Sequence, residues 1–385
     1  MHTRVTKMLG IDFPIFAFTH CRDVAAAVSN AGGLGVLGAV AHSPEQLDID
    51  LRWIAEQTKG KPFGVDLLIP RKYVGAEMGG IDRNSLSSML PEEHRRWIDQ
   101  VLERYSVPPL PPASESERDQ RGMAGLRIDP KSMGPLIEVS FAHKAALIAS
   151  ALGTPPDWLV DKAHAAGIPV AALAGRIDHA VAHKQAGVDL IIAQGTEGGG
   201  HTGEIATMVL VPQVVDAVAP TPVLAAGGIA CGRQMAAEMA LGAEGVWCGS
   251  VWLTTHESET SPAIREKFLA AGSADTRRSR SLTGKPARML RSAWTDAWDE
   301  PGAPQPLPMP LQSMLVADAQ RRIHRVAHKA DSSARPLVTY FVGQVVGQMN
   351  TPMSARDVVR GMVEECLDTM DRMNGLFEDD EPETA

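Results

Sequence analysis

The sequence predicts a (β/α)8 barrel, an α/β fold, with an insertion after the third strand and a C-terminal helical extension. Eight short apolar runs alternate with helical patterns over about 250 residues, which matches the size of such a barrel. An open doubly wound sheet is the alternative, but its Gly-x-Gly-x-x-Gly turn is missing after the first run. The expected strands are 13–18, 34–38, 62–69, 145–152, 169–174, 188–193, 222–226 and 245–253.

The first 70 residues alternate strand and helix twice. Asp23 is placed to cap a helix that ends at Gly32. Ser43, followed by proline at the first helical position, starts a second helix that continues to about Lys59. This alternation favours parallel strands with helices packed outside them.

Residues 70–135 interrupt the alternation. They contain a helical pattern at 90–105, a proline-rich stretch at 107–112 and a polar run after it. We interpret this segment as an insertion that serves as a lid or an oligomer contact, or as a surface decoration with a mobile loop.

After the insertion the alternation resumes, and a C-terminal extension follows the eighth strand. The extension includes helical patterns at 261–270 and 354–373, a tight turn at 283–288, and a glycine-containing segment, 341–348, that could close over a ligand. The expected organisation is barrel at 1–69, inserted segment at 70–135, barrel at 136–255, extension packed on the barrel at 256–375 and disordered acidic tail at 376–385.

Composition excludes several classes of function. The 385 residues are 44% hydrophobic and 22% charged, with a net charge of −9, so broad binding to nucleic acid or anionic membranes is not expected. No signal sequence and no 18-residue apolar run is present, so we expect a cytoplasmic protein without a membrane span. Four scattered cysteines lack metal-type spacing and are expected to be reduced thiols, and no metal is predicted.

The stretch 188–203, VDLIIAQGTEGGGHTG, is the first candidate site. A buried strand breaks into Gln194, Gly195 and a glycine-rich loop that carries His201. Backbone without Cβ atoms can approach a ligand closely, and an imidazole can take a carbon-bound proton or bind an anionic substrate. The alternative is a flexible turn with an incidental histidine. His179 and His183, one helical turn apart, could bind a metal but more simply face solvent.

Glycines after the seventh and eighth strands form a second candidate. Gly227-Gly228 and Gly249-Ser250 lie where barrels commonly bind phosphate with backbone N–H groups, although glycines also simply permit tight turns. Asp66 lies among apolar residues of the third strand, where a carboxylate is costly unless it is paired or points into a site. Cys248 is more simply a small core thiol.

Together these motifs resemble the nitronate monooxygenase family, formerly called 2-nitropropane dioxygenases. The matching segments run in order from about residue 10 to 350, and they are AVSNAGGLG (27–35), FGVD (63–66), AQGTEGGGHTG (193–203), LAAGGI (224–229), GVWCGS (245–250), LTGKPAR (282–288) and VGQVVG (342–347). The resemblance implies FMN as cofactor and His201 as the base or substrate hydrogen-bonding group. The expected cofactor contacts are Ala17, Phe18, Thr19, Asp66, Gln194, Gly195, Gly199, Gly200, Gly227, Gly228, Trp247, Cys248, Gly249 and Ser250.

Three departures from the family pattern concern the substrate side. The segment AFTHCR (17–22) replaces the usual Pro-Met pair, Asp66 replaces an asparagine and would place a negative charge near an electron-rich cofactor, and the insertion is long. The resemblance implies oxidation of a small alkyl nitronate by O2 to a carbonyl compound and nitrite. The alternatives are an NAD(P)H-dependent flavin reductase of a quinone or enoyl-CoA-like substrate, and a non-catalytic flavin- or phosphate-binding protein. A homodimer is a further expectation.

Overall fold

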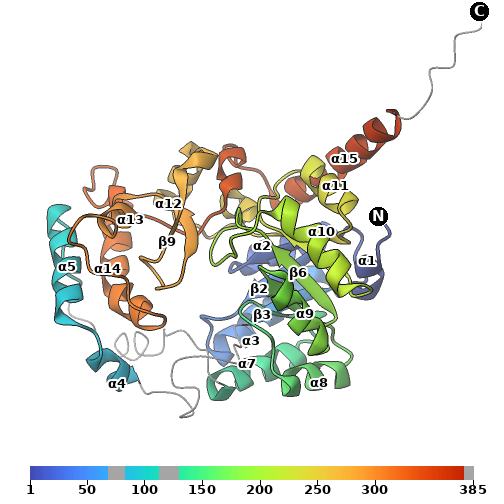
Figure 1. Ribbon diagram of the computed structural model, residues 1–385, viewed down its shortest axis with the longest axis horizontal. Coiled ribbons are helices and arrows are strands. Elements are labelled where there is room, and N and C mark those ends of the chain that lie inside the picture. The colour runs from blue at the N-terminus through green and yellow to red at the C-terminus, as the bar shows by residue number, and fades with distance from the viewer. Residues whose placement is uncertain (68–82, 112–129, 377–385) are drawn as a thin grey trace, which may run out of the picture.

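The computed structural model describes residues 1–67, 83–111 and 130–376. It contains a closed barrel of eight parallel strands in sequence order. The barrel strands lie on the right in Figure 1. The barrel and all eight expected strands are confirmed, and seven of them lie within two residues of their predicted bounds. The eighth, predicted at 245–253, ends at Cys248, because Ser250–Thr254 form a 3-10 helix. The strands are β1 (Ile15–Thr19), β2 (Leu34–Gly38), β3 (Phe63–Leu67), β4 (Leu147–Ser150), β5 (Val170–Ala174), β6 (Leu190–Gln194), β7 (Val223–Ala226) and β8 (Gly245–Cys248).

Helices form a shell around the barrel. Those expected from sequence are α2 (Arg22–Asn30), α3 (Pro44–Thr58), α8 (Asp157–Ala165), α9 (Ile177–Gln185), α10 (Thr207–Val218) and α11 (Gly232–Ala240). Helix α7 (Pro130–Ala142) was not predicted, because Gly134 and Pro135 obscure its pattern; it begins inside the 70–135 stretch and packs against α3. Helix α1 (Arg4–Leu9) was also missed, and its Val5 and Leu9 belong to the apolar cluster inside the barrel.

Side-chain alternation along the strands separates an inner from an outer core. Phe16, Leu34, Ile192 and Trp247 belong to the cluster that fills the barrel interior. Their strand neighbours pack in a separate cluster with the surrounding helices. By the same alternation the side chains of Phe18, Asp66 and Gln194 face the interior at the carboxyl ends of their strands, which is the end where barrel enzymes bind ligands.

A second lobe lies beside the barrel and has its own apolar core. Helix α5 (Glu92–Arg104), which confirms the helix predicted at 90–105, packs against α14 (Leu311–Ala327) although about two hundred residues separate them in sequence (Figure 1). The other elements of the lobe are α12 (Pro262–Ala270), α13 (Ala293–Ala297) and the hairpin β9 (Thr276–Ser279)–β10 (Ala287–Leu290), with α4 (Arg83–Ser88) beside α14. The turn predicted at 283–288 connects the two hairpin strands.

The C-terminal helix returns to the barrel. Helix α15 (Ala355–Asn374) confirms the helix predicted at 354–373, and it packs against α11 and α2 with Val359, Met362 and Cys366 in the outer core. The whole polar run after residue 112 and all but the first residue of the predicted disordered tail, 376–385, lie outside the described residues. None of the helices in the described ranges is long and apolar enough to cross a membrane, and all four cysteines are free.

Candidate active site

The loop after β6 packs closely against the ends of its neighbours. A Cβ on Gly195 would lie 2.0 Å from the Thr207 hydroxyl, and a Cβ on Gly227 would lie 2.9 Å from the Gly195 carbonyl oxygen. The Gly195 N–H donates to Ala226 at 2.9 Å. The two glycine motifs predicted from sequence, one after β6 and one after β7, therefore touch. Gly227 needs glycine because Gly195 is so near, and Gly195 needs glycine because Thr207 is so near.

Glu197 fixes the loop to the start of α10. Its two carboxylate oxygens lie 3.2 and 3.1 Å from the Thr207 N–H, and the second lies 2.9 Å from the Thr207 hydroxyl. A carboxylate at a helix N-terminus accepts from N–H groups that have no partner within the helix and interacts favourably with the helix dipole. Glu197 therefore orients the loop and is not a freely solvated carboxylate.

The second lobe holds the same loop from the opposite side. Gly200 pairs with Arg288 of β10 through two backbone hydrogen bonds of 2.9 and 2.7 Å. The Arg288 guanidinium donates to the Thr196 carbonyl at 2.9 Å. A Cβ on Gly199 would lie 2.9 Å from the Gly343 nitrogen, and the Gly343 N–H donates to Ser250 Oγ at 2.7 Å. The segment 341–348 thus lies directly on the loop.

His201 projects from this loop with its ring partly buried. Its Nδ1 lies 3.1 Å from the Pro286 carbonyl oxygen, and its ring lies 6.4 Å from Phe341 between centroids. A carbonyl only accepts, so Nδ1 carries the hydrogen and the lone pair is on Nε2. Burial lowers the pKa of the imidazole, and the nearby Lys285 charge lowers it further. His201 is therefore a neutral base near pH 7.

Backbone donors gather at the ends of β7 and β8. Gly227 and Gly228 have φ angles of 97° and 74°, which residues with side chains rarely adopt. Within the described ranges, the N–H groups of Gly227, Gly228 and Gly249 donate to no other residue. Gln234, which the sequence analysis did not identify, donates from Nε2 to the Gly228 carbonyl at 2.6 Å and holds the turn. This arrangement offers several donors to an anion.

The barrel mouth beside these donors is aromatic and contains one buried acid. Phe18 and Trp247 stack with centroids 6.3 Å apart. Asp66 is 4% exposed, and its Oδ2 is buried with no hydrogen-bond partner among the residues that the structure describes. Burial raises the pKa of this carboxyl well above its ordinary value. The raised pKa favours the neutral carboxyl over the negative charge expected there from sequence.

Three other predicted cofactor contacts, Ala17, Thr19 and Cys248, have side chains that point away from the barrel interior. Ala17 and Cys248 are fully buried in the outer core, so their side chains face the helices. Thr19 accepts from the Cys21 N–H at 3.0 Å. Burial raises the pKa of the Cys248 thiol to about 12, as suits the small core thiol suggested from sequence. Ala17 and Cys248 could therefore offer a ligand only their backbone atoms, whereas the Thr19 hydroxyl keeps its own hydrogen to donate.

His20 is a mouth residue that the sequence analysis missed. A Cβ on Gly38 would lie 2.7 Å from the His20 ring, so the absence of that Cβ lets the imidazole lie over the end of β2. Its Nδ1 lies 3.0 Å from the Gly38 carbonyl and its ring meets the edge of Phe18. The only sequence signal was the unusual segment 17–22, which replaces the family's Pro-Met pair.

Two groups of side chains resemble metal ligands in spacing, but His183 in one and Cys21 in the other have hydrogen-bond partners of their own. His183 was expected to face solvent but is 1% exposed, with its two ring nitrogens 3.0 Å from Thr154 Oγ1 and the Leu173 carbonyl. One ligand atom each from Cys21, Asp23 and Glu259 comes within 4.8 Å of the others. Burial raises the Cys21 pKa and its thiol donates to the Glu257 carbonyl, which disfavours the thiolate that metals bind.

Comparisons with known proteins agree with this geometry. A family model described as nitronate monooxygenase matches residues 2–365. A Mycobacterium tuberculosis protein with a provisional name as a monooxygenase is 62% identical over 98% of this chain and 100% of its own. A structure of nitroalkane oxidase from Streptomyces ansochromogenes superposes with a TM-score of 0.76 at 25% identity, covering 96% of this chain and 99% of that one. FabK from Thermotoga maritima gives 0.72 at 26% identity, covering 98% and 100%.

Proposed function

Since this chain belongs to the nitronate monooxygenase family and is an oxidoreductase of that family, we propose that it binds FMN and oxidises small alkyl nitronates with O2 to carbonyl compounds and nitrite. The single observation that carries the proposal is the position of His201. The imidazole of His201 is neutral, and its basic nitrogen, Nε2, has no partner among the described residues. The ring is held by the Pro286 carbonyl of the second lobe, and it lies on the loop that also contacts the backbone donors at the end of β7.

The residues at the mouth fit a flavin phosphate and ring. The unpaired N–H groups of Gly227, Gly228 and Gly249 suit a phosphate. Ser250 Oγ already accepts from Gly343, which leaves its own hydrogen to donate. Asp66, whose Oδ2 has no partner among the described residues, and the amide of Gln194 offer polar groups to a ring system, and the stacked Phe18 and Trp247 offer apolar faces. When bound, the flavin would supply the electron transfer and the reaction with O2.

The chain's own contribution is binding, orientation and proton transfer. For a neutral nitroalkane, Nε2 of His201 accepts the proton from the carbon that carries the nitro group. For a preformed nitronate this step is already complete, and His201 hydrogen-bonds the anion after protonation. The Pro286 carbonyl holds the ring orientation in both cases. The glycine-rich loop lets backbone approach the substrate closely.

Two assays test the proposal. The purified protein should release FMN on denaturation, and it should form one nitrite per carbonyl product from a small alkyl nitronate in air. A preparation that takes up no flavin after incubation with FMN would exclude the cofactor. Retained flavin with rapid NAD(P)H oxidation and no nitrite would favour the alternative, an NAD(P)H-dependent reductase. Bound flavin without turnover in either assay would favour the non-catalytic binding protein.

A further inference from the structure

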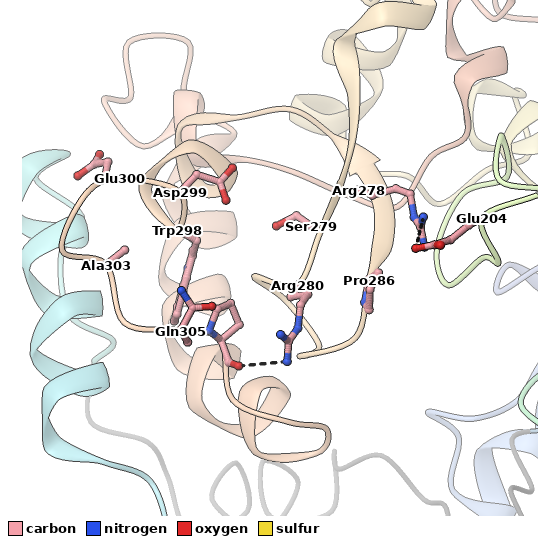
Figure 2. A pocket seen from close by; sticks show the side chains of 11 residues that line it. Glu204, Arg278, Ser279, Arg280, Pro286, Trp298, Asp299, Glu300, Ala303 and Gln305 are labelled. Atoms are coloured by element: carbon pink, nitrogen blue, oxygen red, sulfur yellow. Dashed lines mark hydrogen bonds and ion pairs between the residues drawn. The ribbon is translucent and has the colours of Figure 1, made fainter.

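The two sides of the barrel mouth differ in how their polar side chains are paired. On the side of the second lobe, Arg278 lies 3.5 Å from Glu204 (Figure 2), and Pro286 accepts the hydrogen bond of His201. On the other side, His20 has one ring nitrogen, Nε2, that no residue in the described ranges hydrogen-bonds. The proposed function so far leaves His20 without a role.

The His20 ring lies on the side of the mouth opposite the loop that carries His201. A Cβ on Gly38, the last residue of β2, would lie 2.7 Å from the His20 ring, so the imidazole occupies the space of the missing side chain. His201 follows β6. In a closed barrel of eight strands, β2 and β6 are four positions apart and therefore lie on opposite sides. A ligand that spans the mouth has one histidine at each side.

His20 also lies one layer above the aromatic floor of the mouth, which is formed by Phe18 and Trp247. These two rings stack with centroids 6.3 Å apart. His20 follows Phe18 by two residues, so it faces the same side of the strand about 7 Å further along it. Its ring meets the edge of Phe18 with centroids 5.1 Å apart and an interplanar angle of 76°. A flat ligand on the floor would meet the two aromatic rings with its face and His20 with its edge.

The imidazole of His20 is accessible and can only accept a hydrogen bond from such a ligand. His20 is exposed, whereas Asp66, which is paired with Gly38 across β2 and β3, is 4% exposed. Nδ1 of His20 lies 3.0 Å from the Gly38 carbonyl, which cannot donate, so Nδ1 carries the hydrogen and Nε2 has the lone pair. Desolvation by the surrounding protein lowers the imidazole pKa and outweighs the opposite effect of the Gly38 hydrogen bond, so the ring is neutral.

The flavin ring has one edge that matches this acceptor. The backbone donors proposed for its phosphate follow β7 and β8, and β8 neighbours β1 in the barrel, so the ring can reach the aromatic floor. The dimethylbenzene edge of a flavin is apolar, whereas the pyrimidine edge has two carbonyl oxygens, accepting nitrogens and one N–H, at N3. Because Nε2 of His20 only accepts, N3–H is the one group of the oxidised ring system to which it can hydrogen-bond.

We propose that Nε2 of His20 accepts a hydrogen bond from N3–H of the bound flavin and so orients the ring over the barrel mouth. This inference rests on the FMN part of the proposed function and not on the nitronate reaction. The family pattern has a Pro-Met pair in this segment, and neither of those side chains offers a strong acceptor. His20 therefore gives this chain a polar contact with the cofactor that the pattern does not supply.

The test compares FMN with 3-methyl-FMN, in which a methyl group replaces the N3 hydrogen. Protein freed of its flavin is titrated with each compound, and quenching of flavin fluorescence gives the two dissociation constants. Wild type should bind 3-methyl-FMN at least about fivefold more weakly, the fold-change of an ordinary hydrogen bond of about 1 kcal/mol. His20→Ala should bind both flavins with nearly equal affinity, because it lacks the acceptor and has room for the methyl group.

Two further variants locate the effect. His20→Gln should keep part of the preference for FMN, because its amide oxygen can still accept from N3–H. His179→Ala, at an exposed histidine of α9, is the matched control and should keep the whole preference. Equal affinity of wild type for the two flavins, or a preference that survives in His20→Ala, would overturn the proposal.

A measurement on the wild-type protein keeps the proposal testable if His20→Ala does not fold. The protein is loaded with FMN labelled with ¹⁵N at N3, and the N3–H resonance is recorded by NMR. A hydrogen bond to the imidazole should move the N3 proton downfield of its position in solvated FMN and slow its exchange with water. An N3–H group that exchanges as fast as in unbound FMN would contradict the contact.

Failure of this contact is distinguishable from failure of the proposed function. A protein that binds FMN and forms nitrite from a nitronate, but does not discriminate between the two flavins, refutes only the His20 contact. A protein that prefers FMN to 3-methyl-FMN but forms no nitrite keeps the contact and refutes the nitronate reaction. A protein that binds neither flavin refutes the FMN part of the proposed function, and the contact with it.

Discussion

At the scale of single residues, the charge states of His201 and Asp66 determine which chemistry the barrel mouth can support. The Pro286 carbonyl fixes the hydrogen of His201 on Nδ1, and burial keeps the ring uncharged. Burial also raises the pKa of Asp66, which favours a neutral group where the family pattern has asparagine. Sequence identified both residues but not these pKa shifts, because burial and pairing are properties of the folded chain.

His201 should separate two substrates. With a neutral nitroalkane, kcat/KM should fall as pH decreases below the imidazole pKa, which lies below its ordinary value, because the protonated ring cannot accept a proton. His201→Asn should lower this kcat/KM by about 10²–10⁴-fold, the usual contribution of a general base. The preformed nitronate should lose much less. Equal losses for both substrates would contradict the base assignment, and exposed His179→Asn serves as control.

Asp66 should make stability depend on pH. Its folded-state pKa is raised, so the folded protein retains a proton that the unfolded chain releases. Stability from this group is complete below the unfolded pKa and falls as pH rises toward the folded value. Asp66→Asn should remove that loss, and its gain in melting temperature over wild type should be larger at pH 8 than at pH 5. A gain that does not change with pH would show that Asp66 is ionised in the folded protein.

At the scale of elements, the sequence was most informative where a strand is short, apolar and bounded by glycine or proline. All eight barrel strands met that condition. Helices α1 and α7 did not, because one has only six residues and the other contains Gly134 and Pro135. His20 was missed because its position depends on Gly38 of a different strand, β2. Gln234 was missed because its role depends on its place as the third residue of α11, from which it reaches the Gly228 carbonyl.

The β6 loop gives a prediction at this scale. Gly195→Ala should destabilise the protein by about 1–3 kcal/mol or more, because the new methyl meets Thr207 at 2.0 Å and neither backbone can move freely. Flavin retention should fall with it. Gly361→Ala, on the exposed face of α15 with no atom within 4 Å of the new Cβ, should instead stabilise by about 0.5–1 kcal/mol. Denaturant unfolding measures both, and a neutral Gly195→Ala would refute the close packing.

At the scale of the whole molecule, two lobes meet at one loop. The glycine-rich loop is fixed by Thr207 and Gly227 of the barrel and by Arg288 and Gly343 of the second lobe. The sequence predicted the barrel but not that α5 would pack against α14, because apolar periodicity shows that a helix has a buried face without showing which partner covers it.

The most direct test of the central claim is an anaerobic absorbance titration of the purified, FMN-loaded protein. We predict that the flavin absorbance bleaches on addition of a small alkyl nitronate and changes only slowly with NADH or NADPH. Rapid bleaching by pyridine nucleotide, with none by the nitronate, would contradict the nitronate reaction and assign the chain to the NAD(P)H-dependent reductases.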